Sequence, residues 1–172
     1  MTDGLLTIGK VALVCMTPML DVMLPGDPVA KERHRTGGRD PRTGKPRHYP
    51  GRKSDPWEKW AAWEIRAAWL YGERVLREPC VVHVCAVLSR PKVLEHKAEA
   101  DGRILRDQKP DGDNVLKACL DAIEKSGVLD DDKRVAVKAV ESWWCARGEE
   151  PHVRVVLGLP PIGVACRVRR VG

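Results

Sequence analysis

The segment from Lys109 to Asp132 reads KPDGDNVLKACLDAIEKSGVLDDD. Its apolar side chains recur with helical spacing, and they are Val115, Leu116, Cys119, Leu120 and Ile123. This period predicts an amphipathic helix from Gly112 to Lys125. Gly127 follows the predicted end, where glycine suits the left-handed backbone of a C-terminal cap.

Acidic side chains stand at both ends of this predicted helix. Asp111 and Asp113 flank its first residue, and the run from Asp130 to Asp132 follows its end. Asp113 and Lys117 are four residues apart and therefore share one helix face. A turn that returns past the helix start would bring Asp132 close to Asp111 and Asp113, and we expect that arrangement.

Three clustered carboxylates repel one another unless a cation lies between them. Their hard oxygen atoms suit Mg²⁺ or Mn²⁺, and such an ion polarises a phosphodiester and activates a bound water. Two simpler interpretations remain open: Asp111 or Asp113 is only a helix cap, and the run 130–132 is only a polar turn. A calcium-binding loop is excluded, because Leu116 and Ala122 occupy its required glycine and glutamate positions.

The segment from Asp27 to Lys53 is strongly basic. It carries nine lysines and arginines against three acids. The whole chain of 172 residues has a formal charge of +6 and 43% apolar residues, which indicates one folded domain with a polyanionic partner. We predict that 27–53 is a long loop, and a loop of this length in a compact domain is usually functional.

The remaining segments supply strands and one more helix. We predict a helix with Asp55 as N-cap, Pro56 as its first residue and Glu58 three residues beyond the cap. Tryptophans on this helix fit a buried stripe better than a DNA-stacking surface. Strands are expected at 20–24, 81–88, 135–143 and 153–157, with a hairpin turn near Gly148 joining the last two.

Four further features bear on structure and location. The strand 81–88 is apolar on both faces, so we expect it to be central, with His83 as a structural residue. Residues 90–110 are expected to form a charged linker, either contacting phosphates through Arg106 and its neighbours or simply solvated. The six cysteines lack zinc-site spacing and suggest reduced thiols in a cytoplasmic protein. No apolar run has the length of a membrane span, and we expect no membrane contact.

The acidic segment resembles the signature of RusA-like Holliday junction resolvases, a family common in phages and prophages. That signature has Asp-x-Asp-Asn-x-x-Lys, then Leu-Asp-Ala, then a glycine followed by an Asp-Asp pair. The chain matches it from Asp111 to Lys117, at Leu120-Asp-Ala122, and from Gly127 to Asp132. The stretch from Pro25 to Arg35 looks like the basic Pro-Val-x-Lys-x-Arg-x-Arg segment of the same family.

The resemblance implies roles for particular residues. Asp111, Asp113, Lys117 and Asp132 match the catalytic set, and the three acids would bind Mg²⁺ or Mn²⁺, with Asp131 as the alternative third ligand. The basic residues expected to contact DNA are Lys31, Arg33, Arg35, Arg47, Lys53 and Lys109. The resemblance also implies a homodimer acting on four-way junctions, in a bacterial or phage-infected cell.

We therefore expect an α+β domain, with a mixed sheet of about four to five strands and two main helices. It should span 20–158, with an N-terminal extension at 1–19 and a tail at 159–172. The predicted function is Mg²⁺-dependent resolution of Holliday junctions by paired symmetric nicks in recombination and repair. The alternatives are a related nuclease for flaps or forks, and a non-catalytic protein that binds branched DNA.

Overall fold

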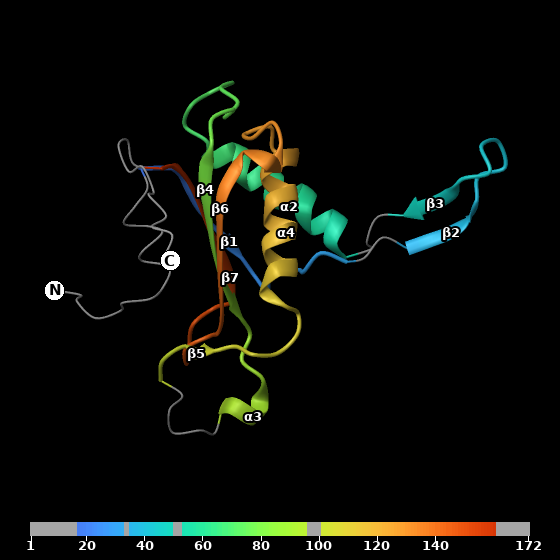
Figure 1. The fold of residues 1–172 in the computed structure, drawn as a ribbon. Coiled ribbons are helices and arrows are strands. Elements are labelled where there is room, and N and C mark those ends of the chain that lie inside the picture. Colours follow the sequence, from blue (N-terminus) through green and yellow to red (C-terminus); the bar gives the residue numbers. More distant parts are fainter. Residues whose placement is uncertain (1–16, 33–34, 50–52, 96–100, 161–172) are drawn as a thin grey trace, which may run out of the picture.

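The computed structural model describes residues 17–32, 35–49, 53–95 and 101–160 (Figure 1). Its main sheet is mixed, because β4 and β6 are parallel while the other neighbouring strands are antiparallel. The five strands follow the order β1-β7-β4-β6-β5. Their bounds are β1 Thr17–Pro25, β7 His152–Leu159, β4 Cys80–Leu88, β6 Val135–Trp144 and β5 Ile104–Leu105.

Two main helices, α2 (Ser54–Ala68) and α4 (Gly112–Lys125), cover one face of the sheet (Figure 1). Two shorter elements are the helical turn α3 (Lys92–Glu95) and the 3-10 helix η1 (Asp132–Arg134). The predicted stripe of α4 is confirmed, since Val115, Cys119, Leu120 and Ile123 are buried in the main core. The strand order and the burial of β4 confirm the α+β class, the mixed sheet and the central position of β4.

The basic segment 27–53 is not a structureless loop, so that prediction was wrong. It contains a hairpin of β2 (Arg35–Arg39) and β3 (Pro46–Tyr49), which projects beyond α2 and away from the main sheet (Figure 1). Asp40 stabilises its turn by accepting a hydrogen bond from the backbone of Arg42 at 2.8 Å. A hairpin outside the core needs no apolar alternation, which is why the sequence pattern did not indicate it.

The last two strands also differ from the prediction. Gly148 does lie in a turn with φ +76°, but β6 and β7 do not pair with each other. Instead β4 lies between them and bonds to both. Every residue of β4 is buried. Burial of its apolar side chains therefore favours a central position in the sheet, with a hydrogen-bonded strand on each side.

The start of α2 lies two residues earlier than predicted. The helix begins at Ser54, and Lys53 occupies the cap position without a side-chain hydrogen bond, so Asp55 is not the N-cap. Asp55 lies in the first turn and pairs with Lys59 at 2.7 Å. Trp57 and Trp60 pack against the core as expected, whereas Trp63 is 66% exposed.

Four cysteines in the described residues, Cys80, Cys85, Cys119 and Cys145, are buried and form no disulfide. Burial raises the pKa of the Cys119 thiol to about 12. His83 is buried in β4 as expected, with its Nε2 2.8 Å from Glu141 Oε1. The linker 90–110 contributes two regular elements, α3 and β5, to the described part of the chain.

An ion pair links the first strand to the last one. Arg154 of β7 donates two hydrogen bonds to Asp21 of β1, at 2.8 and 2.6 Å, and this lowers the pKa of Asp21 below its ordinary 3.8. Because both side chains are nearly half exposed, we expect Asp21→Asn to lower the free energy of unfolding by less than about 1 kcal/mol at pH 7.

The free energy of unfolding lost in Asp21→Asn should become smaller as the pH falls. A carboxyl whose pKa is depressed on folding stabilises the protein above its unfolded pKa and ceases to do so as the pH falls through the folded value. Urea unfolding at pH 7 and at pH 2.5 measures the effect. A difference between wild type and variant that grows on acidification would contradict the assignment.

Candidate active site

The candidate site is built around the first turn of α4. Asp111 is the N-cap residue, with extended backbone at φ −65° and ψ 141°, and its carbonyl accepts the amide of Asn114 at 3.0 Å. Its carboxylate makes no capping hydrogen bond. The interpretation of Asp111 as only a side-chain cap is therefore wrong, and the carboxylate is not occupied by the helix amides.

Asp113 and Lys117 lie one turn apart on the exposed side of α4. Lys117 Nζ donates to Asp113 Oδ2 at 3.1 Å, and this bond holds the pKa of Asp113 below its usual value. Exposed pairs of this kind contribute little to stability. The lysine can therefore exchange its partner for an incoming phosphate at small cost.

Asp111, Asp113 and Lys117 line one open cavity of about 1240 Å³. Its other walls come from the turn before α4 and from the chain leading to the β2–β3 hairpin, namely Ala30, Lys31, Glu32, Lys109, Pro110 and Asn114. The backbone amide of Lys31 donates to the Asn114 carbonyl at 2.9 Å, which attaches the N-terminal segment to α4. Three acids, Glu32, Asp111 and Asp113, and three lysines thus line a space large enough for a DNA backbone.

Glu58 is buried and forms an ion-pair cluster with Lys31, which lines this cavity, and with Lys125. Its carboxylate accepts from Lys31 Nζ at 2.8 Å and from Lys125 Nζ at 2.5 Å, and Lys31 also contacts Asp121. Burial lowers the pKa of Lys31, but the hydrogen bonds to Asp121 and Glu58 outweigh it and the net shift is upward. The sequence analysis placed Glu58 only as a helix-start residue and missed this role.

Arg106, which directly follows β5, contacts both the turn before Asp111 and a tryptophan of β6. Arg106 lies over the Trp144 ring at 5.0 Å and donates from Nη1 to the Pro110 carbonyl at 2.8 Å. Burial lowers the pKa of Arg106, and the charge of Asp111 acts in the opposite direction. Among the described residues, the buried Arg106 Nε and Ser142 Oγ find no hydrogen-bond partner, and both residues line a cavity of about 330 Å³ beside Asp111.

Gly112 allows α4 to start directly against β6. A Cβ at this position would lie 3.3 Å from Ser142 Oγ and 3.6 Å from Val140 Cγ1. We expect Gly112→Val to reduce the free energy of unfolding by about 1–3 kcal/mol, because the added carbons have no room. Gly102→Val is the control, since Gly102 has no atom within 4 Å of its added Cβ. Urea unfolding of both variants checks the prediction, which fails if they lose equal stability.

The predicted convergence of Asp132 on Asp111 and Asp113 does not occur within one chain. Asp132 begins η1 just before β6, next to the C-terminal end of α4, whereas Asp111 lies at the other end of that helix (Figure 1). The 14 residues of α4 span about 21 Å at 1.5 Å each. The turn after α4 continues into β6 and does not return past the helix start.

Each acid of the run 130–132 has a basic neighbour. Asp130 Oδ1 lies 3.1 Å from Arg134 Nε, Asp131 Oδ2 lies 2.7 Å from Lys133 Nζ, and Asp132 Oδ2 lies 3.5 Å from Lys138 Nζ. Asp131 also caps η1 by accepting the Lys133 amide at 2.9 Å. Within the described parts of the chain, no three side chains of the types His, Cys, Asp or Glu gather closely enough to hold a metal ion.

The expected DNA-contacting residues lie in different settings. Lys109 lines the large cavity, and Lys53 is exposed at the start of α2. Lys31 is engaged by Glu58 and Asp121. Arg35 and Arg47 belong to β2 and β3, so the hairpin carries them, and Arg33 lies outside the described residues.

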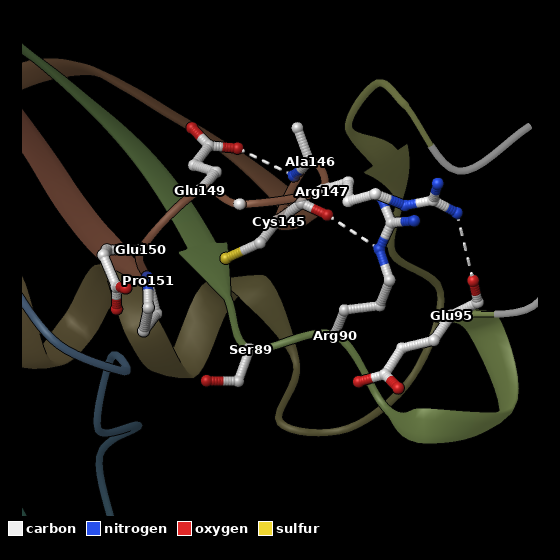
Figure 2. Close-up of a pocket in the computed structure, with 10 residues that line it drawn as sticks. Ser89, Arg90, Glu95, Cys145, Ala146, Arg147, Glu149, Glu150 and Pro151 are labelled. Atoms are coloured by element: carbon white, nitrogen blue, oxygen red, sulfur yellow. Dashed lines mark hydrogen bonds between the residues drawn. The ribbon is translucent and has the colours of Figure 1, made fainter.

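Another cavity, of about 560 Å³, lies between the ends of β4 and β6 and the turn that leads to β7 (Figure 2). Arg90 Nε crosses it to donate to the Cys145 carbonyl at 2.8 Å, and Glu149 accepts the Ala146 amide at 2.8 Å. These bonds tie the turn together. None of the predicted site residues lines this cavity, and we assign it no part in the chemistry.

Comparison with known families decides between a nuclease and a generic basic domain. Residues 25–157 match the family model described as Endodeoxyribonuclease RusA. The chain belongs to this family. The matched range includes the whole first turn of α4 and both acidic segments, so the RusA resemblance of the sequence is confirmed. A search of curated proteins found no match.

Membership in the RusA family makes this chain a nuclease of the hydrolase class. Asp111 and Asp113, two of the three carboxylates that line the cavity, suit a divalent cation by their donor chemistry, because hard oxygen ligands are those that Mg²⁺ prefers. No described helix combines the length and apolarity needed to cross a membrane.

Proposed function

We propose that this RusA-family protein is a Mg²⁺-dependent endonuclease that resolves four-way DNA junctions by paired symmetric nicks in recombination and repair. The observation that carries the proposal is the grouping of Asp111, Asp113 and Lys117 on one open cavity at the start of α4. A protein that only bound DNA would gain nothing from carboxylates facing the phosphates. A nuclease needs them to hold a cation.

In this mechanism Asp111 and Asp113 would hold Mg²⁺, with Mn²⁺ as a substitute, whereas Asp132 lies at the far end of α4 and cannot join them within one chain. The bound metal would polarise the phosphodiester and activate water. Lys117 leaves Asp113 and stabilises the negative charge that develops on the reacting phosphate. Lys109 and the basic hairpin position the DNA backbone, which gives binding that weakens as salt rises.

A synthetic four-way junction with labelled strands tests the proposal. With Mg²⁺, the protein should cut two opposite strands at symmetric positions, and chelation should stop the reaction. A panel of flap, fork and linear duplex substrates measures structural preference. Equal cleavage of linear duplex and junction would remove the resolvase assignment, and junction binding without turnover in any divalent metal would favour a purely binding protein.

A further inference from the structure

Arg106 carries buried hydrogen-bond donors without acceptors beside the proposed metal site. Its Nη1 donates to the Pro110 carbonyl at 2.8 Å, and its backbone amide donates to the Ser142 carbonyl at 3.0 Å. Its Nε and Nη2 are buried, yet within the described parts of the chain neither atom has a hydrogen-bond partner. A buried charged donor without an acceptor loses its hydration and gains nothing in return. Its presence in a folded protein therefore points to a bound molecule or to a functional role.

The same two atoms of arginine bind aspartate elsewhere in this chain. Arg154 donates from Nε and Nη2 to the two carboxylate oxygens of Asp21, and Arg134 does the same to Asp130 at 3.1 and 3.2 Å. The planar guanidinium presents these atoms as a fork that matches the spacing of two carboxylate oxygens. The unpaired fork of Arg106 is therefore suited to a ligand with two oxygen atoms.

Charge indicates which oxygen ligand the fork of Arg106 takes. Among the described residues that line the cavity of about 330 Å³ beside it, Asp107 and Asp111 are acidic and Arg106 alone is basic. The lining is therefore negative overall, which disfavours a DNA phosphate. Burial lowers the pKa of Arg106, and of the two acids Asp111 opposes this shift more strongly. The Asp111 carboxylate, which makes no capping hydrogen bond, is the acceptor that fits these observations.

We propose that Arg106 is a positioning residue for Asp111, whose carboxylate turns to accept hydrogen bonds from Nε and Nη2 as it binds the metal. The inference rests on the proposed function, because it assumes that Asp111 binds a divalent cation. A carboxylate has about four lone-pair sites, so two bonds from Arg106 leave oxygen lone pairs for a cation. Arg106 is itself held by the Pro110 carbonyl and by the Trp144 ring, 5.0 Å from its guanidinium carbon.

Substitution of Arg106 separates positioning from charge, because the two effects have opposite signs. Removing a positive charge beside a cation site should by itself tighten Mn²⁺ binding, whereas losing the orientation of Asp111 should weaken it. We expect Arg106→Gln and Arg106→Lys each to weaken Mn²⁺ binding by about 10-fold or more, measured by calorimetry without DNA. Lysine keeps the charge but lacks the fork. At subsaturating Mn²⁺, kcat for junction cleavage should fall in both variants while KM for the junction stays unchanged.

Arg103→Gln is the matched control. Arg103 directly precedes β5 as Arg106 directly follows it, but its fork is already paired with Glu149, and it does not line the cavity beside Asp111. This variant should keep the Mn²⁺ affinity of wild type. Urea unfolding identifies the variants that are folded, and Arg106→Lys provides the test if Arg106→Gln is not.

Tighter or unchanged Mn²⁺ binding in either folded Arg106 variant would overturn the inference. A higher KM for the junction with unaltered Mn²⁺ affinity would also overturn it and make Arg106 a phosphate contact. If wild type binds Mn²⁺, the Arg106 variants bind it more weakly and no protein cuts junctions, the inference is supported and the proposed function is refuted. Junction cleavage by wild type with unaltered Mn²⁺ affinity in the variants would do the reverse.

Discussion

Asp113→Asn is expected to lower Mg²⁺-dependent junction cleavage by at least about 10²-fold while leaving junction binding intact. Asparagine keeps the shape of the side chain but removes the negative charge that would hold the metal. Metal stabilisation of the reacting phosphate is worth several kcal/mol, and each 1.36 kcal/mol is a tenfold change in rate. Single-turnover cleavage and gel-shift titration in Ca²⁺ measure the two quantities.

Asp101→Asn is the control for this substitution. Asp101 is also an exposed aspartate, with its side chain 88% exposed and 3.6 Å from Arg147, and it does not line the cavity at the start of α4. The Asp101→Asn variant should cleave junctions at the wild-type rate. Full activity of Asp113→Asn would remove this residue from the metal site. Equal losses in both variants would indicate a general effect of surface charge.

The second large effect should come from the ion-pair cluster around Glu58. Replacing Lys31 and Lys125 together by methionine leaves the Glu58 carboxylate buried without a cationic partner. Breaking a buried ion pair in this way costs about 3–5 kcal/mol, because the remaining charge stays desolvated. Urea unfolding should show the loss, and each single substitution should cost less than half of it.

Two further variants make this prediction specific. Lys59→Met removes a surface lysine that is 71% exposed and pairs only with Asp55 among the contacts described, and it should leave the urea midpoint unchanged. Adding Glu58→Gln to the double variant should recover part of the stability, since a buried neutral amide costs less than an unpaired carboxylate. No recovery would show that the loss arises from the methionines themselves.

The sequence predicted those elements whose burial follows one clear period. The bounds of α4 agree with the structure at both ends, because its stripe is uninterrupted and Gly127 ends it with a left-handed residue at φ +73°. The strand β4 was predicted from its continuous apolar run, and all of its residues are buried. The candidate acids at the start of α4, Asp111 and Asp113, were predicted from the residue pattern and matched the family signature, and they share one cavity.

The parts that were missed depend on long-range contacts. Local sequence does not determine which strands become neighbours in a sheet. The short connection between β6 and β7 had suggested that these two strands pair as a hairpin, but β4 lies between them. Glu58 carries an ordinary helix-start pattern, and only the lysines from two distant segments reveal its burial. The separation of Asp132 from Asp111 follows from the direction in which the chain leaves α4, and residue spacing does not encode that direction.

The place of β7 has a consequence for how the protein is synthesised. Among the described strands, β1 comes first in the chain and has one neighbour in the sheet, β7, which comes last. A nascent chain on the ribosome can form α4 and the β4–β6 pair early, but β1 has no strand to bind until the final segment emerges. Copies that end before β7 would therefore leave β1 and one side of β4 without a neighbouring strand and be open to degradation.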